Sequence, residues 1–386
     1  MIMGLKTSLA AVGVATSALA LAACGSGESA TTTTAPSGSS ASETSLSAAA
    51  AFLDPLKATV SWPAPADLSA PVDVKGKSIW WIPIGDAIAE IHAQGEGFRQ
   101  AAEAAGATVK LCDGKFNPAD IGNCLSQAAS QGADAVVTDY IDYAAVPTAF
   151  DALEKANVPV LIAGAVRPDG VSDTALRAFY DDSPTTVLMS QAVAAGALLA
   201  GGDAPNGLAI VLTDSDNTRA ATEQLGIKWT ELCPDCPVTS IEFSTANMDK
   251  LSSSVSAALV SNPDINVVMV PNDAFTGPVT QALKTAGKAD AKIVSSGADL
   301  ANMQSVKAGT QAGDAGGAGI HAGWAISNAL FQLLAGDTVA PNNPVVRYFD
   351  SSNIGDLTLT PEAYLSNAWY GDDSYQDAYK AAWGIS

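Results

Sequence analysis

The residues of this chain with the clearest potential for binding chemistry are polar side chains that directly follow short apolar runs. Carboxylates, an amide, a tyrosine and arginines recur in this position. In chain order they are Asp86, Glu90, Asp139, Tyr140, Arg167, Asp214, Arg219, Asn272, Asp273 and Asp299. Each alone is explained equally well as a helix cap or a polar loop residue. Their recurrence at the same end of successive apolar runs favours a shared site for a small polar ligand.

The common motifs of catalysis and nucleotide binding are missing from the sequence. There is no G-x-S-x-G, no G-x-x-x-x-G-K-[ST], and no G-x-G-x-x-G after an apolar run. The two histidines, His92 and His321, lack partners at metal-ligand spacing. We therefore expect no metal, no cofactor and no enzymatic activity. A pair of carboxylates acting as acid and base stays open, because carboxylates are numerous.

The composition limits the partners further. The chain has 386 residues, 19 Lys and Arg against 40 Asp and Glu, and a net charge of −21. Such a charge repels phosphate backbones, which argues against binding to nucleic acid. With 48% hydrophobic residues the chain has ample material for a packed core, and its length predicts about two domains.

The elements that must position the polar residues follow an alternating pattern. From Lys77 onward, short apolar runs alternate with amphipathic helical segments, which predicts parallel sheets covered by helices. The predicted strands are Ser78–Ile84, Ala107–Leu111, Ala135–Thr138, Val158–Ala163, Leu208–Thr213, Val238–Phe243, Ile265–Val270 and Lys292–Ser295. The series is interrupted near Val166–Asp182, which favours two α/β lobes over one large sheet. In such sheets ligands bind beyond the carboxyl ends of the strands, where the polar residues fall.

The amino terminus predicts export. Residues 1–23 have Lys6 before an apolar stretch too short to span a membrane, as in a signal peptide. Leu21-Ala22-Ala23-Cys24 resembles the lipobox of bacterial lipoproteins. That resemblance implies a lipid on Cys24 and an extracytoplasmic protein anchored to the bacterial cell membrane. An ordinary signal peptide is the alternative.

Residues 24–74 predict a tether. The segment is rich in Gly, Ser, Thr and Ala up to about Ser47, which is typical of a flexible spacer. Residues 48–74 are rich in proline, and we expect this lead-in to pack loosely on the folded body.

Four further cysteines, Cys112, Cys124, Cys233 and Cys236, lie in the exported part. Export favours structural disulfides, and four cysteines allow three pairings. Pairing of sequence neighbours requires only short loops. A redox dithiol or half of a zinc site at Cys233-Pro-Asp-Cys236 is the alternative, but further zinc ligands are distant in sequence.

From about Lys77 to Gly336 the chain resembles the periplasmic-binding-protein type I family, in its sugar class that serves ABC importers. Several short motifs carry the resemblance in the family's order and spacing. They are Gly97-Phe-Arg-Gln-Ala-Ala-Glu-Ala-Ala-Gly106, Gln131-Gly-Ala-Asp-Ala-Val-Val137, Ala156-Asn-Val-Pro-Val-Leu-Ile162, Pro271-Asn-Asp273 and Ala282-Leu-Lys-Thr-Ala-Gly287.

The resemblance implies two Rossmann-like lobes joined by three crossovers that close on a ligand by hinge motion. The crossovers are expected near Phe179–Asp182, Ser296–Asp299 and Gly313–Gly317. Lobe 1 then comprises residues 75–180 plus about 298–315. Lobe 2 comprises residues 181–297 plus about 316–386.

The resemblance also implies how the solute is held. Asn272 and Asp273 match the family's ligand-contacting Asn-Asp, and Arg219 lies near the position of its ligand arginine. The Asp-Arg pair that grips sugar hydroxyls in many members is absent, since Gly164 and Ala165 stand in its place. The ligand is therefore expected to be a sugar, a polyol or a similar small polar solute, with an amide, an amino-acid-like compound or a cationic molecule as further options.

The expected function is that of a monomeric extracytoplasmic lipoprotein that delivers its solute to an ABC permease. A sensory receptor for a membrane signalling partner would share the fold, and the sequence does not separate the two. An exported α/β enzyme is a third alternative, for which no motif was found.

Overall fold

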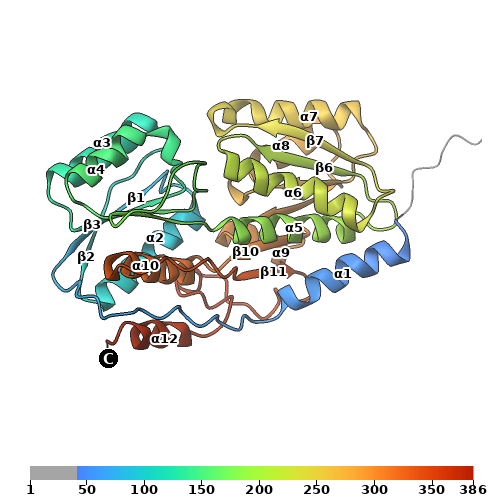
Figure 1. The fold of residues 1–386 in the computed structure, drawn as a ribbon. Coiled ribbons are helices and arrows are strands. Elements are labelled where there is room, and N and C mark those ends of the chain that lie inside the picture. Colours follow the sequence, from blue (N-terminus) through green and yellow to red (C-terminus); the bar gives the residue numbers. More distant parts are fainter. Residues whose placement is uncertain (1–40, 386) are drawn as a thin grey trace, which may run out of the picture. The chain divides into compact units, whose positions relative to one another are not determined.

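The computed structural model describes residues 41–385, apart from the side chain of Asp216. The predicted signal peptide, the lipidation site Cys24 and most of the predicted spacer therefore lie outside the described residues. Within them the chain forms two α/β lobes with mostly parallel sheets, as the sequence predicts (Figure 1).

The first sheet is entirely parallel, with strand order β2-β1-β3-β4-β5. Its strands are β1 (Ser78–Pro83), β2 (Thr108–Leu111), β3 (Ala135–Asp139), β4 (Val160–Ala163) and β5 (Arg177–Tyr180). The helices α2 (Ala89–Ala104) and α10 (Gly319–Ala335) share a core with one face, and α3 (Pro118–Ser130) and α4 (Pro147–Lys155) share a core with the other. The neighbours Trp80 and Trp81 point to opposite faces of β1, and both are buried.

The second sheet has strand order β11-β10-β9-β8-β6-β7, and its one antiparallel pair is β10 with β11. The strands are β6 (Gly207–Leu212), β7 (Val238–Phe243), β8 (Val267–Val270), β9 (Lys292–Ser296), β10 (Gly313–Gly317) and β11 (Val346–Asp350). The helices of this lobe are α5 (Ser183–Ala200), α6 (Asp216–Leu232), α7 (Leu251–Ser261), α8 (Thr276–Thr285) and α9 (Leu300–Lys307). Short turns η1 (Tyr143–Ala145), η2 (Thr245–Lys250) and η3 (Asp273–Phe275) precede helices α4, α7 and α8.

From residue 298 onward, the chain contributes to the two lobes in a different order from the one predicted from the sequence. Residues 298–315, expected in lobe 1, form α9 and most of β10 in the second sheet. Helix α10, expected in lobe 2, packs on α2 in lobe 1 (Figure 1). Between β5 and β11 the chain therefore crosses between the lobes at residues 180–183, 317–319 and 336–345, and not at Ser296–Asp299. After β11, the C-terminal residues Tyr375, Tyr379 and Trp383 return to the core of lobe 1.

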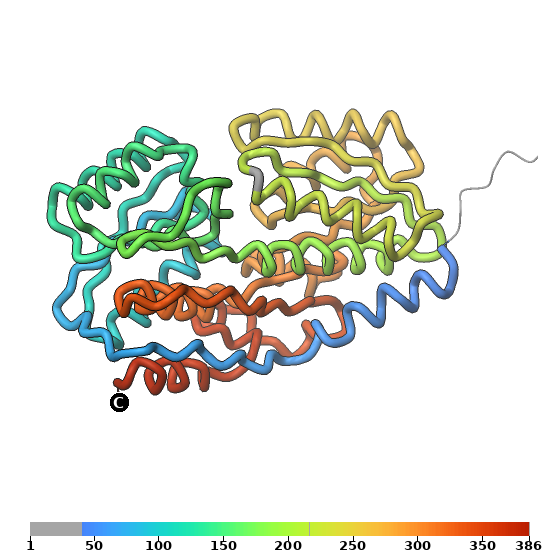
Figure 2. The backbone as a smooth tube through the Cα atoms, viewed as in Figure 1, coloured from blue at the N-terminus to red at the C-terminus, as the bar shows by residue number. Residues whose placement is uncertain are grey.

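The lead-in is more ordered than predicted. Helix α1 (Glu43–Lys57) begins inside the predicted spacer, is capped by the Ser42 hydroxyl, and buries Ala49 and Leu53 in the core of lobe 2. Residues 58–74 then run along the C-terminal segment that contains α11 (Pro361–Tyr364) and α12 (Ser374–Ala382) (Figure 2).

Trp62 anchors the lead-in. Its ring stacks on His321 with centroids 4.9 Å apart, and its Nε1 donates to the carbonyl of Asp372 at 2.9 Å. Burial of this indole among other rings explains why the Pro-rich segment is not loose.

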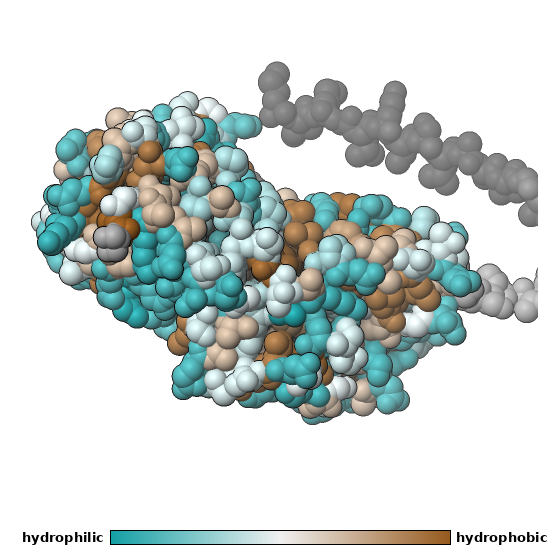
Figure 3. All heavy atoms as spheres, turned by 90° about the horizontal axis from the view of Figure 1, so that it is seen from below, coloured by the Kyte–Doolittle hydropathy of each residue, from teal (hydrophilic) through white to brown (hydrophobic). Residues whose placement is uncertain are grey.

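Helix α5 has no charged residue over 18 positions and is long and apolar enough to cross a membrane by length and composition. Half of it is buried, and it packs against α6, α1, β9 and β10, so it serves as the core helix of lobe 2. On the face shown in Figure 3, hydrophobic residues form separate patches between hydrophilic ones.

The cysteines pair with their sequence neighbours. Cys112 bonds Cys124, which ties the end of β2 to α3, and Cys233 bonds Cys236 after the end of α6. The Cα–Cα distances are 5.8 and 5.3 Å. This is the local one of the three possible pairings.

Candidate functional site

Six carboxylates gather where the carboxyl ends of the strands meet the crossovers, and we call them the acidic cluster. They come from both lobes and from a crossover between them. Its members are Glu90 in the first turn of α2, Asp139 at the end of β3, Asp182 after β5, Asp273 after β8, Asp299 before α9 and Asp314 in β10. Four of these acids were expected from the sequence, namely Glu90, Asp139, Asp273 and Asp299.

Asp139 is the most unusual member of the cluster. Its side chain is fully buried, and neither carboxylate oxygen has a hydrogen-bond partner. Burial, followed by the charges of Asp182 and Glu90, holds the pKa of Asp139 well above its usual range. The next residue, Tyr140, has a positive φ of 56° and donates its hydroxyl to Asp182 at 2.5 Å. The sequence therefore positions two acids and a phenol beside one another at the end of β3.

Glu90 occupies the centre of the cluster. Burial is the largest cause that raises its pKa to about 8, and the charges of Asp299, Asp182 and Asp314 add to it. A Cβ built on Gly317 would lie 3.4 Å from its Oε1, so the crossover passes directly beside the carboxylate. Glu90 also lines a small cavity of about 30 Å³ together with Gln94 and Asp182.

The lobe 2 acids are held by hydrogen bonds within their own lobe. Asp273 accepts from the hydroxyl of Ser295 and, at 2.7 Å, from the backbone N–H of Asp299. Asp314 accepts from the backbone N–H of Ala298 at 3.0 Å and from the Gln311 amide at 3.1 Å. Burial raises the pKa of Asp314 to about 7 and that of Asp299 to about 6.

The two lobes touch beside the cluster. The side-chain amide of Asn217, at the start of α6, donates to the carbonyl of Gly164 at the end of β4, at 3.1 Å. Its oxygen accepts from the Ser183 hydroxyl at 2.7 Å. Tyr180 similarly donates to Asn342 at 3.1 Å, which joins two crossovers. The cleft is therefore closed in this structure.

Basic side chains are paired with other acids. Arg167 pairs with Asp173, Arg177 with Glu154, Arg219 with Glu242, and His92 with Asp86. Among residues 41–385, no Lys, Arg or His forms an ion pair with a member of the acidic cluster. Within these residues the cluster therefore has no cationic side chain to balance its charge when its carboxyl groups ionise. The same residues contain no group of three or more His, Cys, Asp or Glu arranged to hold a metal ion.

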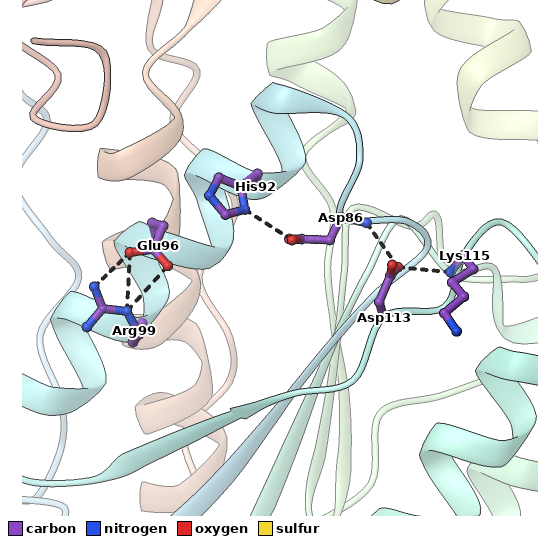
Figure 4. A network of polar contacts seen from close by, with 6 residues as sticks. All are labelled: Asp86, His92, Glu96, Arg99, Asp113 and Lys115. Carbon is purple, nitrogen blue, oxygen red and sulfur yellow. Dashed lines mark hydrogen bonds and ion pairs between the residues drawn. The ribbon is translucent and has the colours of Figure 1, made fainter. Parts of the chain in front are cut away.

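Several predicted site residues have other partners. Asp86 lies on the loop before α2, and its carboxylate pairs with His92 of α2 at 3.1 Å (Figure 4). The backbone N–H of Asp86 donates to the carboxylate of Asp113. Asp214 accepts hydrogen bonds from Ser244 and Thr245, and so caps η2. Asn272 likewise caps η3 through the N–H of Ala274.

The two predicted arginines lie toward solvent. Arg167 and Arg219 are both more than a third exposed, with their partners Asp173 and Glu242 outside the cluster. The structure thus brings together Tyr140 and four of the predicted acids, while Asp86, Asp214, Asn272 and both arginines have the local contacts described.

Two members of the acidic cluster and two neighbouring tyrosines are not among the site residues predicted from the sequence. Asp182 and Asp314 lie in stretches interpreted as crossovers. Tyr364 and Tyr370 come from the C-terminal segment, and burial followed by nearby charges, those of Glu90 and Asp314 among them, raises the pKa of each. Position after a strand could have signalled Asp182, whereas no sequence pattern marks the tyrosines.

Replacing Asp273 by alanine is expected to destabilise lobe 2 by about 2–4 kcal/mol, because a buried N–H and a buried hydroxyl lose their acceptor. Urea unfolding measures the loss. Asn272→Ala is the control, since Asn272 is less buried and caps only a short turn. Equal stability of the two variants would contradict a structural role for Asp273.

Two α/β lobes joined by crossovers, with a small cavity lined by polar groups where they meet, form the architecture seen in periplasmic binding proteins. The chain belongs to the periplasmic binding protein family, whose domain model, described as "Periplasmic binding protein domain", matches residues 76–338. Members of this family are extracytoplasmic and bind solutes for transport, so the chain is not an enzyme. No curated protein sequence matches it.

Solved structures share the fold at low sequence identity. A 5-methylthioribose transporter solute-binding protein from Thermotoga lettingae is 15% identical with a TM-score of 0.65, covering 82% of this chain and 99% of its own. An ABC transporter solute-binding protein from Agrobacterium vitis, bound to α-D-tagatopyranose, is 18% identical with a TM-score of 0.62, covering 73% and 97%. A carbohydrate transporter from Acidothermus cellulolyticus, in complex with myo-inositol, is 17% identical with a TM-score of 0.57, covering 72% and 96%.

Proposed function

We propose that this protein captures a small hydroxylated solute of the sugar or polyol type between its lobes and delivers it to an ABC permease. The observation that carries the proposal is the Asn217–Gly164 hydrogen bond, which joins the lobes beside buried acceptors that have no partner in the protein. A bound solute with several hydroxyl groups would supply donors to these acceptors. The structural neighbours named above bind compounds of this kind, which supports the same class here.

Cys24 carries the lipid in this proposal, which would keep the receptor at the membrane beside its permease. The lipobox and the Gly/Ser-rich segment after it support this assignment. Fractionation of cells tests it: the wild type would be found with the membrane, and Cys24→Ser would be released or left unprocessed. A membrane-bound Cys24→Ser protein of mature size would contradict lipidation.

A thermal-shift screen against sugars and polyols tests solute capture. A ligand that binds only the folded state raises the melting temperature. At a ligand concentration 100 times Kd, it adds about 2.7 kcal/mol to the free energy of unfolding. We expect one chemical series to stabilise the protein, with the ligand recovered unchanged by mass spectrometry. Consumption of the ligand would contradict a transport receptor, and loss of uptake on deletion of the gene would support one.

A further inference from the structure

We propose that the solute carries a protonated amine on its hydroxylated frame, and that Asp139 and Glu90 receive this amine. The inference rests on the proposed function and narrows it from neutral sugars and polyols to amino sugars and amino polyols.

The first argument is the charge of the site. Carboxylates from both lobes meet there, and the nearby basic side chains are bound to other acids, as described above. At the end of β4, where the resemblance would place an Asp-Arg pair, the chain has Gly164 and Ala165. A Cβ on Gly164 would lie 3.0 Å from Asp139 Oδ1. Because residue 164 is glycine, it places no side chain beside this carboxyl group, next to the hydrogen bond from Asn217 of lobe 2. A cation from the solute would balance the charge of the cluster acids as they ionise.

The second argument is the kind of hydrogen bond that the site still needs. The unpartnered buried atoms around the cluster include four carboxyl or amide oxygens, namely both oxygens of Asp139, Oδ1 of Asp182 and Oε1 of Gln94, beside the Tyr364 hydroxyl and Nε2 of His321. The nearest phenol, that of Tyr140, already donates to Asp182. A sugar hydroxyl donates one proton and also needs donors for its own lone pairs, whereas an ammonium group has three donors and no acceptor. The unmet need of this site therefore matches an ammonium better than a hydroxyl.

The third argument is the position of Asp139. It is fully buried at the carboxyl end of a central strand, next to Asp182 and Glu90. Burial without hydrogen bonds favours the neutral acid and raises the pKa of Asp139, and a cationic partner would stabilise its ionised form. Asp273 and Asp314, by contrast, have N–H and O–H donors from their own lobe. Asp139 is thus the acid of the cluster with the most unused hydrogen-bonding capacity.

Titration calorimetry with matched pairs tests the proposal. The pairs are D-glucose with D-glucosamine, D-galactose with D-galactosamine, and D-glucitol with 1-amino-1-deoxy-D-glucitol, with the neutral N-acetyl derivatives of the two amino sugars added. We expect an amine to bind at least 10-fold more tightly than its neutral partner and its N-acetyl derivative. Equal or tighter binding of the neutral compounds would overturn the amine while leaving the proposed function intact. Absence of binding by every sugar, polyol and amine would overturn both, and competition by Ca²⁺ alone would replace the amine by a metal.

Substitution of the acids tests where the amine binds. Asp139→Asn keeps the shape and removes the charge, so the amine should bind at least 10-fold more weakly while a neutral ligand changes by less than 3-fold. Glu90→Gln provides a second test if Asp139→Asn fails to fold. The control is Asp134→Asn, just before the same strand, where the side chain pairs with Lys77 at the surface. Unchanged amine binding in Asp139→Asn and Glu90→Gln, or an equal loss in Asp134→Asn, would overturn the assignment.

Discussion

Raising the pH from 5 to 8 is expected to lower the melting temperature of the ligand-free protein by roughly 5 °C or more. The cause is burial of the acidic cluster, which raises the pKa of Glu90 to about 8, of Asp314 to about 7, and of Asp182 and Asp299 to about 6. A carboxyl group whose pKa is higher in the folded than in the unfolded state stabilises the fold while it is protonated in both. That contribution is complete below about pH 4 and is lost progressively as the pH rises from there, until each group passes its folded pKa of about 6, 7 or 8.

The size of the effect follows from linkage. Each unit of difference in pKa corresponds to about 1.4 kcal/mol, and several groups ionise in the same interval. The sum overstates the loss, because Glu90, Asp182 and Asp299 are partly exposed and screened by solvent. The titratable groups around Glu90 are the other cluster acids Asp139, Asp182, Asp299 and Asp314 and three tyrosines, which remain neutral in this range, namely Tyr140, Tyr364 and Tyr370.

His321 acts in the opposite direction. It lines the same small cavity as Glu90, and burial lowers its pKa to about 4, so its contribution grows as the pH rises through the ordinary range of histidine. One histidine opposes six acids, and its effect is complete near pH 7. The fall in stability should therefore be steepest between about pH 5 and 6, where the acids have lost their protons in the unfolded chain but keep them in the folded one, and should become shallower toward about pH 8.

Two variants distinguish the pH dependence that comes from the acidic cluster from that of other acids in the protein. Glu90→Gln should flatten the dependence of melting temperature on pH. Asp134→Asn should leave its slope unchanged, because hydrogen bonds from the Ser78 N–H and Lys77 lower the pKa of Asp134, so that it ionises below this range. Differential scanning calorimetry in buffers of matched ionic strength measures the curves. A wild-type melting temperature that is constant or rises from pH 5 to 8 would contradict the buried cluster.

The fold was predictable because the local signals agree with one another. Continuously apolar runs such as those that become β6 and β8 indicate strands covered on both faces, and the helices between them require parallel sheets. The placement of the late elements was not predictable in the same way. Helix α10 is apolar on most of its surface and would fit either core, and only its packing on α2 decides the lobe.

The site was predictable only in part, for a related reason. A polar residue after a strand either faces the cleft or caps the next helix, and the sequence looks alike in both cases. Asp139 and Asp214 both follow strands, yet Asp139 is buried without a partner while Asp214 binds the N–H and hydroxyl of Thr245. Tyr364 and Tyr370 reach the site from far along the chain, which is a tertiary contact that no local pattern encodes.

Replacement of Gly323 by alanine is expected to destabilise the protein by about 3 kcal/mol or more. Gly323 lies in α10 where the backbone of this helix meets that of α2. A Cβ there would lie 2.2 Å from the backbone nitrogen of Phe98 and 2.3 Å from the carbonyl oxygen of Gln94. The contact is reciprocal, because a Cβ on Gly97 would lie 2.1 Å from the carbonyl oxygen of Ile320. Backbone atoms on both sides leave no flexible side chain to move aside, so the helices must separate.

Gly122→Ala in α3 is the matched control. It is also a glycine inside a helix, but a Cβ there would have no atom within 4 Å, so the better helix propensity of alanine should raise stability by up to about 1 kcal/mol. The two variants share the gain in propensity and differ in the clash, so the difference between their urea midpoints reports the packing of α2 on α10. Because α2 carries Glu90 and α10 follows the crossover at Gly317, separation of the helices should also weaken ligand binding in Gly323→Ala and leave it unchanged in Gly122→Ala. Equal stability of the two variants would show that the helices are further apart than the structure has them.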